Sequence, residues 1–267
     1  SLLGTYITDK VEQGEKPDDK RRLSPAVSLS WRPFSESTLR IRASYKDIFR
    51  VPTFTDLYYL RMVNTNLKPE ETSQYNVGVT WSSSCGDWLR HFSISADGYY
   101  NTVKDKIVAL PTMYVWKMMN MGEVDIKGVD VNLSTQFRLP LRMSLFLAST
   151  YSFQYAVDVT DPEAKDQIPY TPRHSGTVSV TLENPWVNVS YILTAVGDRY
   201  ALPQNIDRNR IDSYIEQSIS INRDFRFRYF GLHLQGELLN LTNVNYDVIQ
   251  YYPMPGRSWR LSVCLSY

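Results

Sequence analysis

Apolar and polar side chains alternate along most of this chain, and a period of two indicates β-strands with two unlike faces. The last segment is the clearest case, since Trp259, Leu261, Val263 and Leu265 are separated by polar or small residues. Residues 103–110 allow at most one or two helical turns. We therefore predict about twelve strands, at residues 2–8, 26–31, 39–46, 75–81, 92–100, 129–134, 143–155, 177–182, 187–195, 214–221, 231–239 and 258–266.

Composition narrows the class of protein further. The 29 Lys and Arg residues balance 28 Asp and Glu residues, which argues against a basic nucleic-acid-binding chain and against disorder. No apolar run approaches the roughly 18 to 20 residues that a membrane-spanning helix needs. A transmembrane β-barrel stays possible, because only every second residue of its strands must be apolar. The 19 Tyr, 6 Trp and 10 Phe residues suit surfaces that are only partly in contact with water, such as membrane interfaces.

The predicted connections are alternately long and short. Consecutive strands of an up-and-down meander place all odd connections at one edge and all even ones at the other. One edge therefore carries large loops and the other tight turns, as in outer-membrane barrels. The long connections are predicted at residues 9–24, 47–71, 101–121, 156–171, 197–212 and 241–256. The short ones are predicted at residues 32–38, 82–90, 139–141, 183–185 and 222–230.

A soluble β-sandwich would also give alternating strands. Its strands are typically about 5 to 6 residues long, whereas several segments here sustain the roughly 9 to 11 residues of a tilted strand that crosses a bilayer. The polar face carries charges such as Arg40, Arg42, Asp130 and Glu237, which suits a wet lumen. The sequence thus favours an all-β, antiparallel up-and-down meander within a transmembrane barrel.

Three groups of short motifs resemble those of TonB-dependent outer-membrane receptors. They are Phe49-Arg50-Val51-Pro52 with Asn66-Leu67-Lys68-Pro69-Glu70, then Asn120-Met121-Gly122 with Gly128, and finally Leu239-Asn240-Leu241 with Pro255-Gly256-Arg257. Their order and spacing along the chain make the resemblance specific. In detail the motifs look most like the cobalamin and siderophore receptors of Bacteroidota.

This resemblance implies a 22-stranded barrel closed by an N-terminal plug, in the outer membrane of a Gram-negative bacterium. Residues 1–267 would be the C-terminal portion of that barrel, without the plug. The implied function is uptake of a scarce nutrient, such as cobalamin or a ferric siderophore, by way of extracellular loops. The implied partners are outer-membrane lipid, a small-molecule ligand and the TonB system through the missing plug, and not nucleic acid. The isolated chain is expected to self-associate, because its first and last strands would be open edges.

Aromatic, cationic and thioether side chains in the predicted long loops are the candidates for ligand contact, since loops on a rigid scaffold carry recognition. The alternative for each is packing among the loops. The candidates are Tyr58, Tyr59, Arg61, Met62, Tyr114, Trp116, Arg199, Tyr200, Tyr251 and Tyr252.

The motif residues have simpler structural interpretations. A rim salt bridge is favoured for Arg50 over an anionic ligand, and Pro69 with Glu70 is expected to form a latch at the loop rim. Gly122 and Gly128 are expected at bulges or close approaches, and Gly256 with Pro255 at a turn before the last strand. Structural roles are assigned to Phe49, Arg50, Pro52, Asn66, Leu67, Pro69, Glu70, Asn120, Gly122, Gly128, Asn240, Pro255, Gly256 and Arg257.

Neither catalysis nor a resident cofactor is indicated. The three histidines are distant in sequence, the two cysteines are far apart, and no hydrolase, zinc or phosphate-loop motif is present. Carboxylates cluster in one loop and could hold calcium, although a solvated acidic loop is favoured. They are Asp158, Asp161, Glu163 and Asp166. The alternatives to a receptor are a passive pore or adhesin barrel and, less favoured, an outer-membrane barrel hydrolase.

Overall fold

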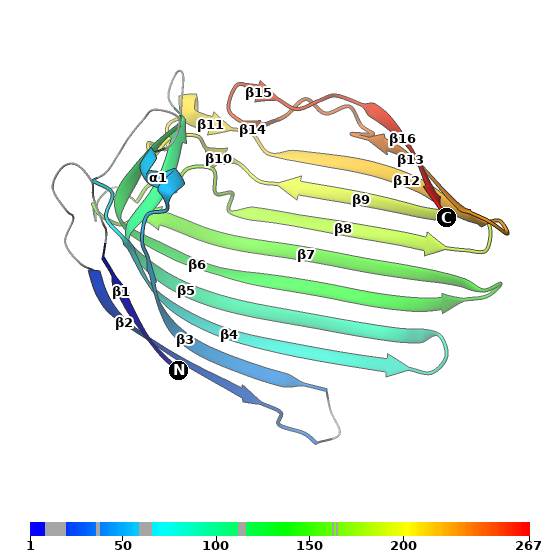
Figure 1. Ribbon diagram of the computed structural model, residues 1–267, viewed down its shortest axis with the longest axis horizontal. Coiled ribbons are helices and arrows are strands. Elements are labelled where there is room, and N and C mark those ends of the chain that lie inside the picture. The colour runs from blue at the N-terminus through cyan, green and yellow to red at the C-terminus, as the bar shows by residue number, and fades with distance from the viewer. Residues whose placement is uncertain (9–19, 36–37, 59–65, 112–115, 162, 164) are drawn as a thin grey trace.

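Twelve strands form one antiparallel sheet in which each strand pairs with the next, as the computed structural model shows in Figure 1. It describes residues 1–8, 20–35, 38–58, 66–111, 116–161, 163 and 165–267. The strands of the sheet are β1 (Leu2–Ile7), β2 (Lys20–Trp31), β3 (Arg40–Arg50), β4 (Glu70–Cys85), β5 (Leu89–Pro111), β6 (Trp116–Leu139), β7 (Met143–Asp158), β8 (His174–Glu183), β9 (Asn188–Val196), β12 (Tyr214–Arg226), β13 (Gly231–Leu239) and β16 (Ser258–Ser266). The predicted meander of twelve strands is confirmed.

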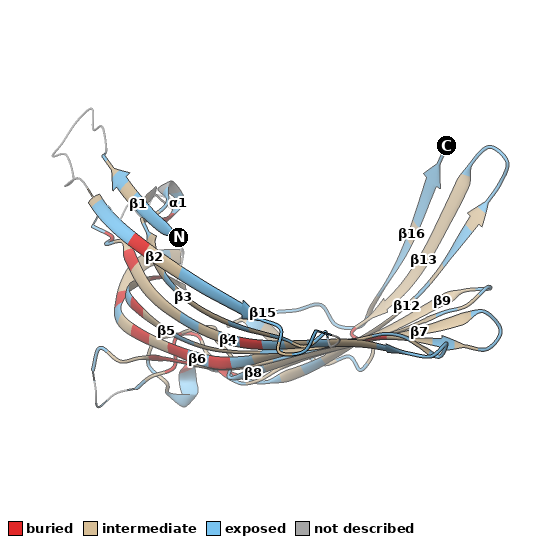
Figure 2. Cartoon of the chain, turned by 90° about the horizontal axis from the view of Figure 1, so that it is seen from below, coloured by how far each residue is buried: buried red, intermediate tan, exposed pale blue. Residues whose placement is uncertain are grey.

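The sheet curves into an open trough, with β1 at one margin and β16 at the other (Figure 2). Short turns lie at one end of the strands and the larger loops at the other, as the sequence predicted (Figure 1). The loop end also carries the small elements. They are α1 (Phe54–Tyr58), β10 (Arg199–Tyr200), the 3-10 turn Asp207–Asn209, β11 (Arg210–Ile211), β14 (Asp247–Ile249) and β15 (Tyr252–Pro253).

One predicted connection is wrong. Residues 101–111 and 116–121 are strand rather than loop, and residues 103–110 contain no helical turn, because β5 and β6 continue as a paired ladder up to Pro111 and Trp116. Asp105 adopts a positive φ of 51° and lies in a charged Lys-Asp-Lys stretch, which hides the alternation there. Strands β5 and β6 are therefore the longest of the sheet, with 23 and 24 residues.

The two faces of the sheet differ in polarity. Tyr75, Val77, Val79 and Trp81 share one face of β4, and all four side chains are exposed. The apolar residues of β16 are exposed in the same way, Trp259 by 79% of its surface. Contiguous apolar exposure of this extent marks a surface that another apolar phase covers.

Aromatic side chains line up across this apolar face. Tyr45 is opposite Tyr75, which is opposite Tyr100 on the next strand. Their ring centroids are 4.9 Å and 6.4 Å apart. Such a row, at the loop end of the strands, is typical of the aromatic girdle of a membrane barrel.

The opposite face is held by polar pairs across the ladder. Arg42, Gly78 and Asp97 are register partners on three consecutive strands, and Arg42 Nη2 lies 2.9 Å from Asp97 Oδ1. A Cβ at position 78 would overlap the Asp97 carboxylate. Glycine at the middle position therefore lets the outer two side chains meet.

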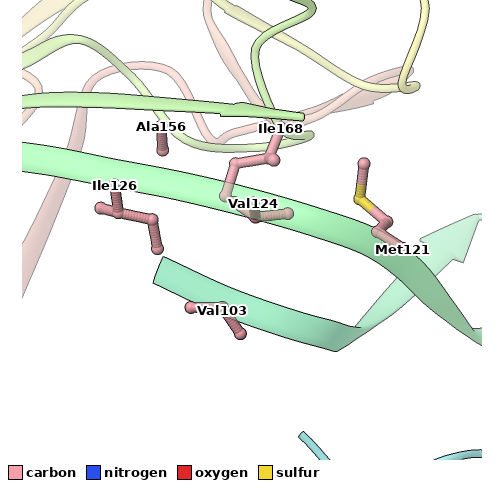
Figure 3. Close-up of a cluster of buried hydrophobic side chains, with 6 residues drawn as sticks. All are labelled: Val103, Met121, Val124, Ile126, Ala156 and Ile168. Atoms are coloured by element: carbon pink, nitrogen blue, oxygen red, sulfur yellow. The ribbon is translucent and has the colours of Figure 1, made fainter. Parts of the chain in front are cut away.

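A buried apolar cluster lies at the loop end of β5, β6 and β7 (Figure 3). Val124 is fully buried and stands opposite the end of β7, and Ile126 is opposite Ala156. Ile168, from the segment after β7, covers them, and its backbone N–H donates to Ala156 O over 3.1 Å. The cluster therefore fixes the β7–β8 connection against the strand ends, on the face that also carries Asp130.

No α-helix in the described part of the chain is long and apolar enough to cross a bilayer.

The assignment of the two faces predicts opposite effects of arginine at adjacent positions. Val263→Arg puts a charge on the apolar face, where it costs about 2 to 4 kcal/mol near the middle of a bilayer. We expect this variant of the intact protein to be depleted from the outer-membrane fraction, measured by heat-modifiable gel mobility. Ser262→Arg is the matched control on the polar face and should assemble. Val131→Arg and Asn132→Arg test the same parity on β6, and equal assembly within both pairs would contradict it.

Candidate functional site

The segment between β3 and β4 is closed by an ionic latch, which we define as Arg50, Thr53, Asp56 and Glu70. Arg50 Nη2 donates to Asp56 Oδ2 over 2.9 Å, and Arg50 Nη1 donates to Glu70 Oε2 over 3.1 Å. Thr53 and Asp56 bond reciprocally at the start of α1, as a capping box does. Both terminal nitrogens of Arg50 thus have carboxylate partners, and Arg50 forms salt bridges at the rim.

The latch is tied to the neighbouring long strands. Glu70 is buried, and its Oε1 accepts the backbone N–H of Ile107 over 2.7 Å. Asn120 on β6 accepts from Lys68 N and donates to the carbonyl oxygens of Lys68 and Asp105. Among the other motif residues, Asn66, Leu67 and Pro69 lie in the sequence between Asp56 and Glu70, Phe49 precedes Arg50, and Pro52 is two residues after it. The segment between β3 and β4 is therefore tied to β5 and β6.

The remaining motif residues also have structural contacts. Gly122 and Gly128 lie where a Cβ would overlap Thr160 and the Phe153 carbonyl oxygen, respectively. Asn240 is buried with a φ of 50°, and its side chain bonds Val244 and Pro255 across the last loop. Asn243 accepts the N–H of Arg257 and leaves no room for a Cβ at Gly256.

A pocket of about 520 Å³ lies at the loop end of the sheet, and we call it the rim pocket. Val196 and Tyr214 are register partners, and Tyr214 lies on the same face of β12 as Glu216. The pocket is therefore on the polar face of the sheet. Its volume is within the range of small-molecule sites. The residues that line it are Val108, Ala109, Trp116, Pro169, Tyr170, Pro172, Val196, Arg199, Tyr214, Val248 and Ile249.

Arg199 is the charged member of this lining, and it is only 4% exposed. The small β10–β11 pair holds its backbone, and its Nη2 donates to the carbonyl oxygens of Asp247 and Val248. Its guanidinium carbon lies 5.6 Å from the ring centre of Tyr214. Its Nη1 is buried without a hydrogen-bond partner in the described residues. Burial lowers the pKa of this guanidinium, which nonetheless stays charged at neutral pH.

Tyr170 brings the second unpaired polar atom to the rim pocket. Its φ is 56°, a conformation that bulky residues rarely adopt, and its N–H donates to Tyr200 O over 2.7 Å. Its ring centre lies 6.1 Å from that of Trp116. The buried hydroxyl lies near the Gln250 backbone without forming a hydrogen bond of ordinary geometry. Burial is also the main reason that the pKa of Tyr170 is raised.

The structure brings together two of the predicted ligand residues, Trp116 and Arg199, at the rim pocket. Tyr200 supplies a backbone contact to the pocket and is half-buried. Tyr251 and Tyr252 are exposed at the β14–β15 turn, outside the pocket. Tyr58 ends α1. Tyr59, Arg61, Met62 and Tyr114 lie outside the described residues.

Sequence reasoning missed Tyr170 and Tyr214. The Pro-Tyr-Thr-Pro run at 169–172 was the available signal, because two prolines in a long loop fix the backbone around an aromatic side chain. Tyr214 was counted as the start of a strand, which it is, and its proximity to Arg199 depends on how the loop folds back.

The acidic loop shows local turn contacts. Asp158 Oδ1 accepts the N–H of Thr160, and Asp161 Oδ1 accepts the N–H of Glu163, as short acidic turns do. Across the described residues, no three His, Cys, Asp or Glu side chains are close enough together to hold a metal ion.

The model of the family described as "TonB dependent receptor-like, beta-barrel" matches residues 5–245. Among curated proteins, the vitamin B12 transporter BtuB of Photobacterium profundum is 27% identical over 233 residues, which are 84% of this chain and 34% of that protein. BtuB of Vibrio vulnificus is 25% identical over 231 residues, which are 80% of this chain and 33% of that protein. The chain spans about a third of the length of these relatives.

Solved structures show the same fold at low sequence identity. The copper transporter OprC superposes with a TM-score of 0.70 at 16% identity, covering 94% of this chain and 40% of OprC. The siderophore receptor PiuA of Acinetobacter baumannii gives 0.69 at 16% identity, covering 96% of this chain and 38% of PiuA. The FrpB iron transporter of Neisseria meningitidis (F5-1 variant) gives 0.68 at 16% identity, covering 99% and 42%.

The latch predicts that adjacent glutamates contribute unequally to stability. Glu70→Gln removes the charge that faces Arg50 while the shape of the side chain is kept, and we expect a loss of about 1 to 3 kcal/mol in the free energy of unfolding. Glu71→Gln is the matched control, because Glu71 pairs with Arg22 between half-exposed side chains, where a pair contributes about 0 to 1 kcal/mol. Denaturant-induced unfolding of the intact protein in detergent measures both. An equal loss from both variants would show that the latch is not special.

Proposed function

This chain belongs to the TonB-dependent receptor-like β-barrel family, and we propose that it is the C-terminal part of a receptor that imports a scarce nutrient across the outer membrane. The family match over residues 5–245 is the observation that carries this proposal. The family consists of outer-membrane transporters of Gram-negative bacteria rather than enzymes. The apolar face of the sheet accordingly faces lipid, and the polar face with the rim pocket faces the lumen.

The open trough supports the view that this chain supplies part of a larger barrel. We propose that further strands close it into a 22-stranded barrel and that a plug domain fills the lumen and receives energy from TonB. The curated relatives are about three times as long as the matched segment, which leaves room for both. Arg42, Asp97 and the other polar side chains of the lumen face would then contact the plug or water.

The ligand that we propose is a cobalamin, because the curated relatives matched over most of this chain are named vitamin B12 transporters. A ferric siderophore is the second candidate, favoured by the superposition on the siderophore receptor PiuA. Either ligand would first meet the loop end of the sheet, where the rim pocket lies.

Uptake of labelled ligand tests this function. Cells that lack their own cobalamin receptor and produce the intact receptor should accumulate labelled cyanocobalamin, and deletion of tonB should abolish the accumulation. Ferric siderophores labelled with ⁵⁵Fe, in cells without siderophore receptors, test the second candidate in the same way. Accumulation that persists without TonB would instead indicate a passive pore.

The loop asymmetry also predicts which rim faces the cell exterior. Epitope tags within residues 197–212 of the intact receptor should be reached by antibody on whole cells, because extracellular loops are the long ones. A tag at residues 183–185, in the short β8–β9 turn, should be reached only after the outer membrane is permeabilised. Equal labelling of both sites on whole cells would refute this topology, and labelling of the 183–185 tag alone would invert it.

A further inference from the structure

Resting on the proposed receptor function, we propose that the rim pocket binds an anionic oxygen group, a carboxylate or phosphate, that is attached to a flat apolar part of the ligand. The groups that would recognise it are Arg199 Nη1, the Tyr170 hydroxyl and the aromatic wall formed with Trp116.

The first argument is a buried cation without a direct ion pair. Arg199 is only 4% exposed, and no carboxylate of the described residues lies within salt-bridge distance of it. Two carboxylates act on the charge of Arg199 from a greater distance, and each has another partner. Asp198 pairs with Arg210, and Asp247 accepts the N–H of Tyr251. A buried cation without a paired anion is unfavourable, so this geometry is expected where an anion arrives from outside.

The second argument is that two buried, unpaired donors belong to residues that line the same cavity. Arginine can only donate hydrogen bonds, and a tyrosine hydroxyl can donate one. Arg199 Nη1 and the Tyr170 hydroxyl are both buried without partners among the described residues, and both residues line the rim pocket. Native structures pair nearly all such atoms, so two orphans at one cavity indicate a missing acceptor. A cation would find no acceptor on the Arg199 guanidinium and would be repelled by its charge.

The third argument is backbone strain at the same place. Tyr170 adopts a left-handed φ of 56°, which is costly for an aromatic residue and persists only when the surroundings impose it. Its N–H is fixed by Tyr200 O, and Pro169 and Pro172 stiffen the chain on either side. The strain therefore holds at the wall of the rim pocket a residue whose buried hydroxyl has no partner among the described residues.

The walls of the pocket define the rest of the ligand. Apart from Arg199, the lining is made of aliphatic, proline and aromatic residues. Trp116 and Tyr170 have tilted rings at 6.1 Å, and such surfaces bind flat or ring-shaped apolar groups. The pocket therefore suits the edge of a ring system that carries one charged oxygen group.

Simple aromatic fragments test this inference without requiring transport. The probes are phenyl phosphate and benzoate, with neutral benzamide and benzyl alcohol as matched controls, titrated into the intact receptor in detergent and followed by tryptophan fluorescence and calorimetry. We expect the two anions to bind and the neutral compounds to bind at least about tenfold more weakly.

Variants locate the binding to the two donors. Tyr170→Phe removes only the hydroxyl, so it should weaken the binding of phenyl phosphate severalfold while the melting temperature of the free receptor stays constant or rises. Arg199→Gln should abolish the preference for anions. Arg208→Gln is the control, because Arg208 is exposed in the 3-10 turn Asp207–Asn209 at the same rim and does not line the rim pocket.

Three results would overturn the inference: neutral fragments that bind as tightly as anions, no fragment binding at millimolar concentration, or a Tyr170→Phe variant that binds phenyl phosphate like the wild type. A loss of stability in Tyr170→Phe would likewise assign the hydroxyl to packing. A receptor that imports cyanocobalamin yet shows any of these results would retain the proposed function and lose this inference alone.

Discussion

The backbone hydrogen-bond ladder is the constraint on which the rest of this structure depends. A chain in a bilayer finds no water to satisfy its peptide groups, so each strand must pair with neighbours along its whole membrane-crossing length. Antiparallel pairing of consecutive strands meets this need with the shortest connections. It also leaves the side chains free to alternate between lipid and lumen, which is why neither face forms an ordinary hydrophobic core. Side chains buried together appear instead where loop meets strand, as at Val124.

Loop anchoring is therefore the second level of organisation. The β7–β8 connection is held by Ile168 against the ends of β6 and β7, and the β3–β4 segment is held by Arg50 and Glu70. Glu70 also binds the backbone of β5, so the latch and the long β5–β6 hairpin support each other. These contacts place Trp116 and Tyr170 at a fixed separation on elements far apart in sequence. The rim pocket, which is lined by residues of strand ends and of loops, is thereby anchored to the sheet.

Alternation predicted the strands well because lipid on one face and water on the other require apolar and polar side chains in turn along each strand. It failed at residues 101–111, where the positive φ of Asp105 and the flanking lysines conceal a strand that continues to Pro111. Candidate residues were predicted only as types of side chain in long loops. Trp116 and Arg199 meet at one pocket, whereas Tyr251 and Tyr252 lie at a separate turn, and no local pattern separates these cases. The partner of each loop residue depends on how the loop folds back, which the sequence of that loop alone does not specify.

The unpaired atoms at the rim pocket are explained by this division between scaffold and loops. A buried guanidinium nitrogen without a partner among the described residues and a tyrosine with a left-handed backbone both destabilise the folded state. They persist because the apolar cluster, the latch and the Asn240 contacts hold the surrounding loops independently of them. Under the proposed role of the rim pocket, stability and recognition lie in different sets of residues at the same rim. Changes in the side chains that line the pocket would then alter the ligand without disturbing the backbone ladder of the strands.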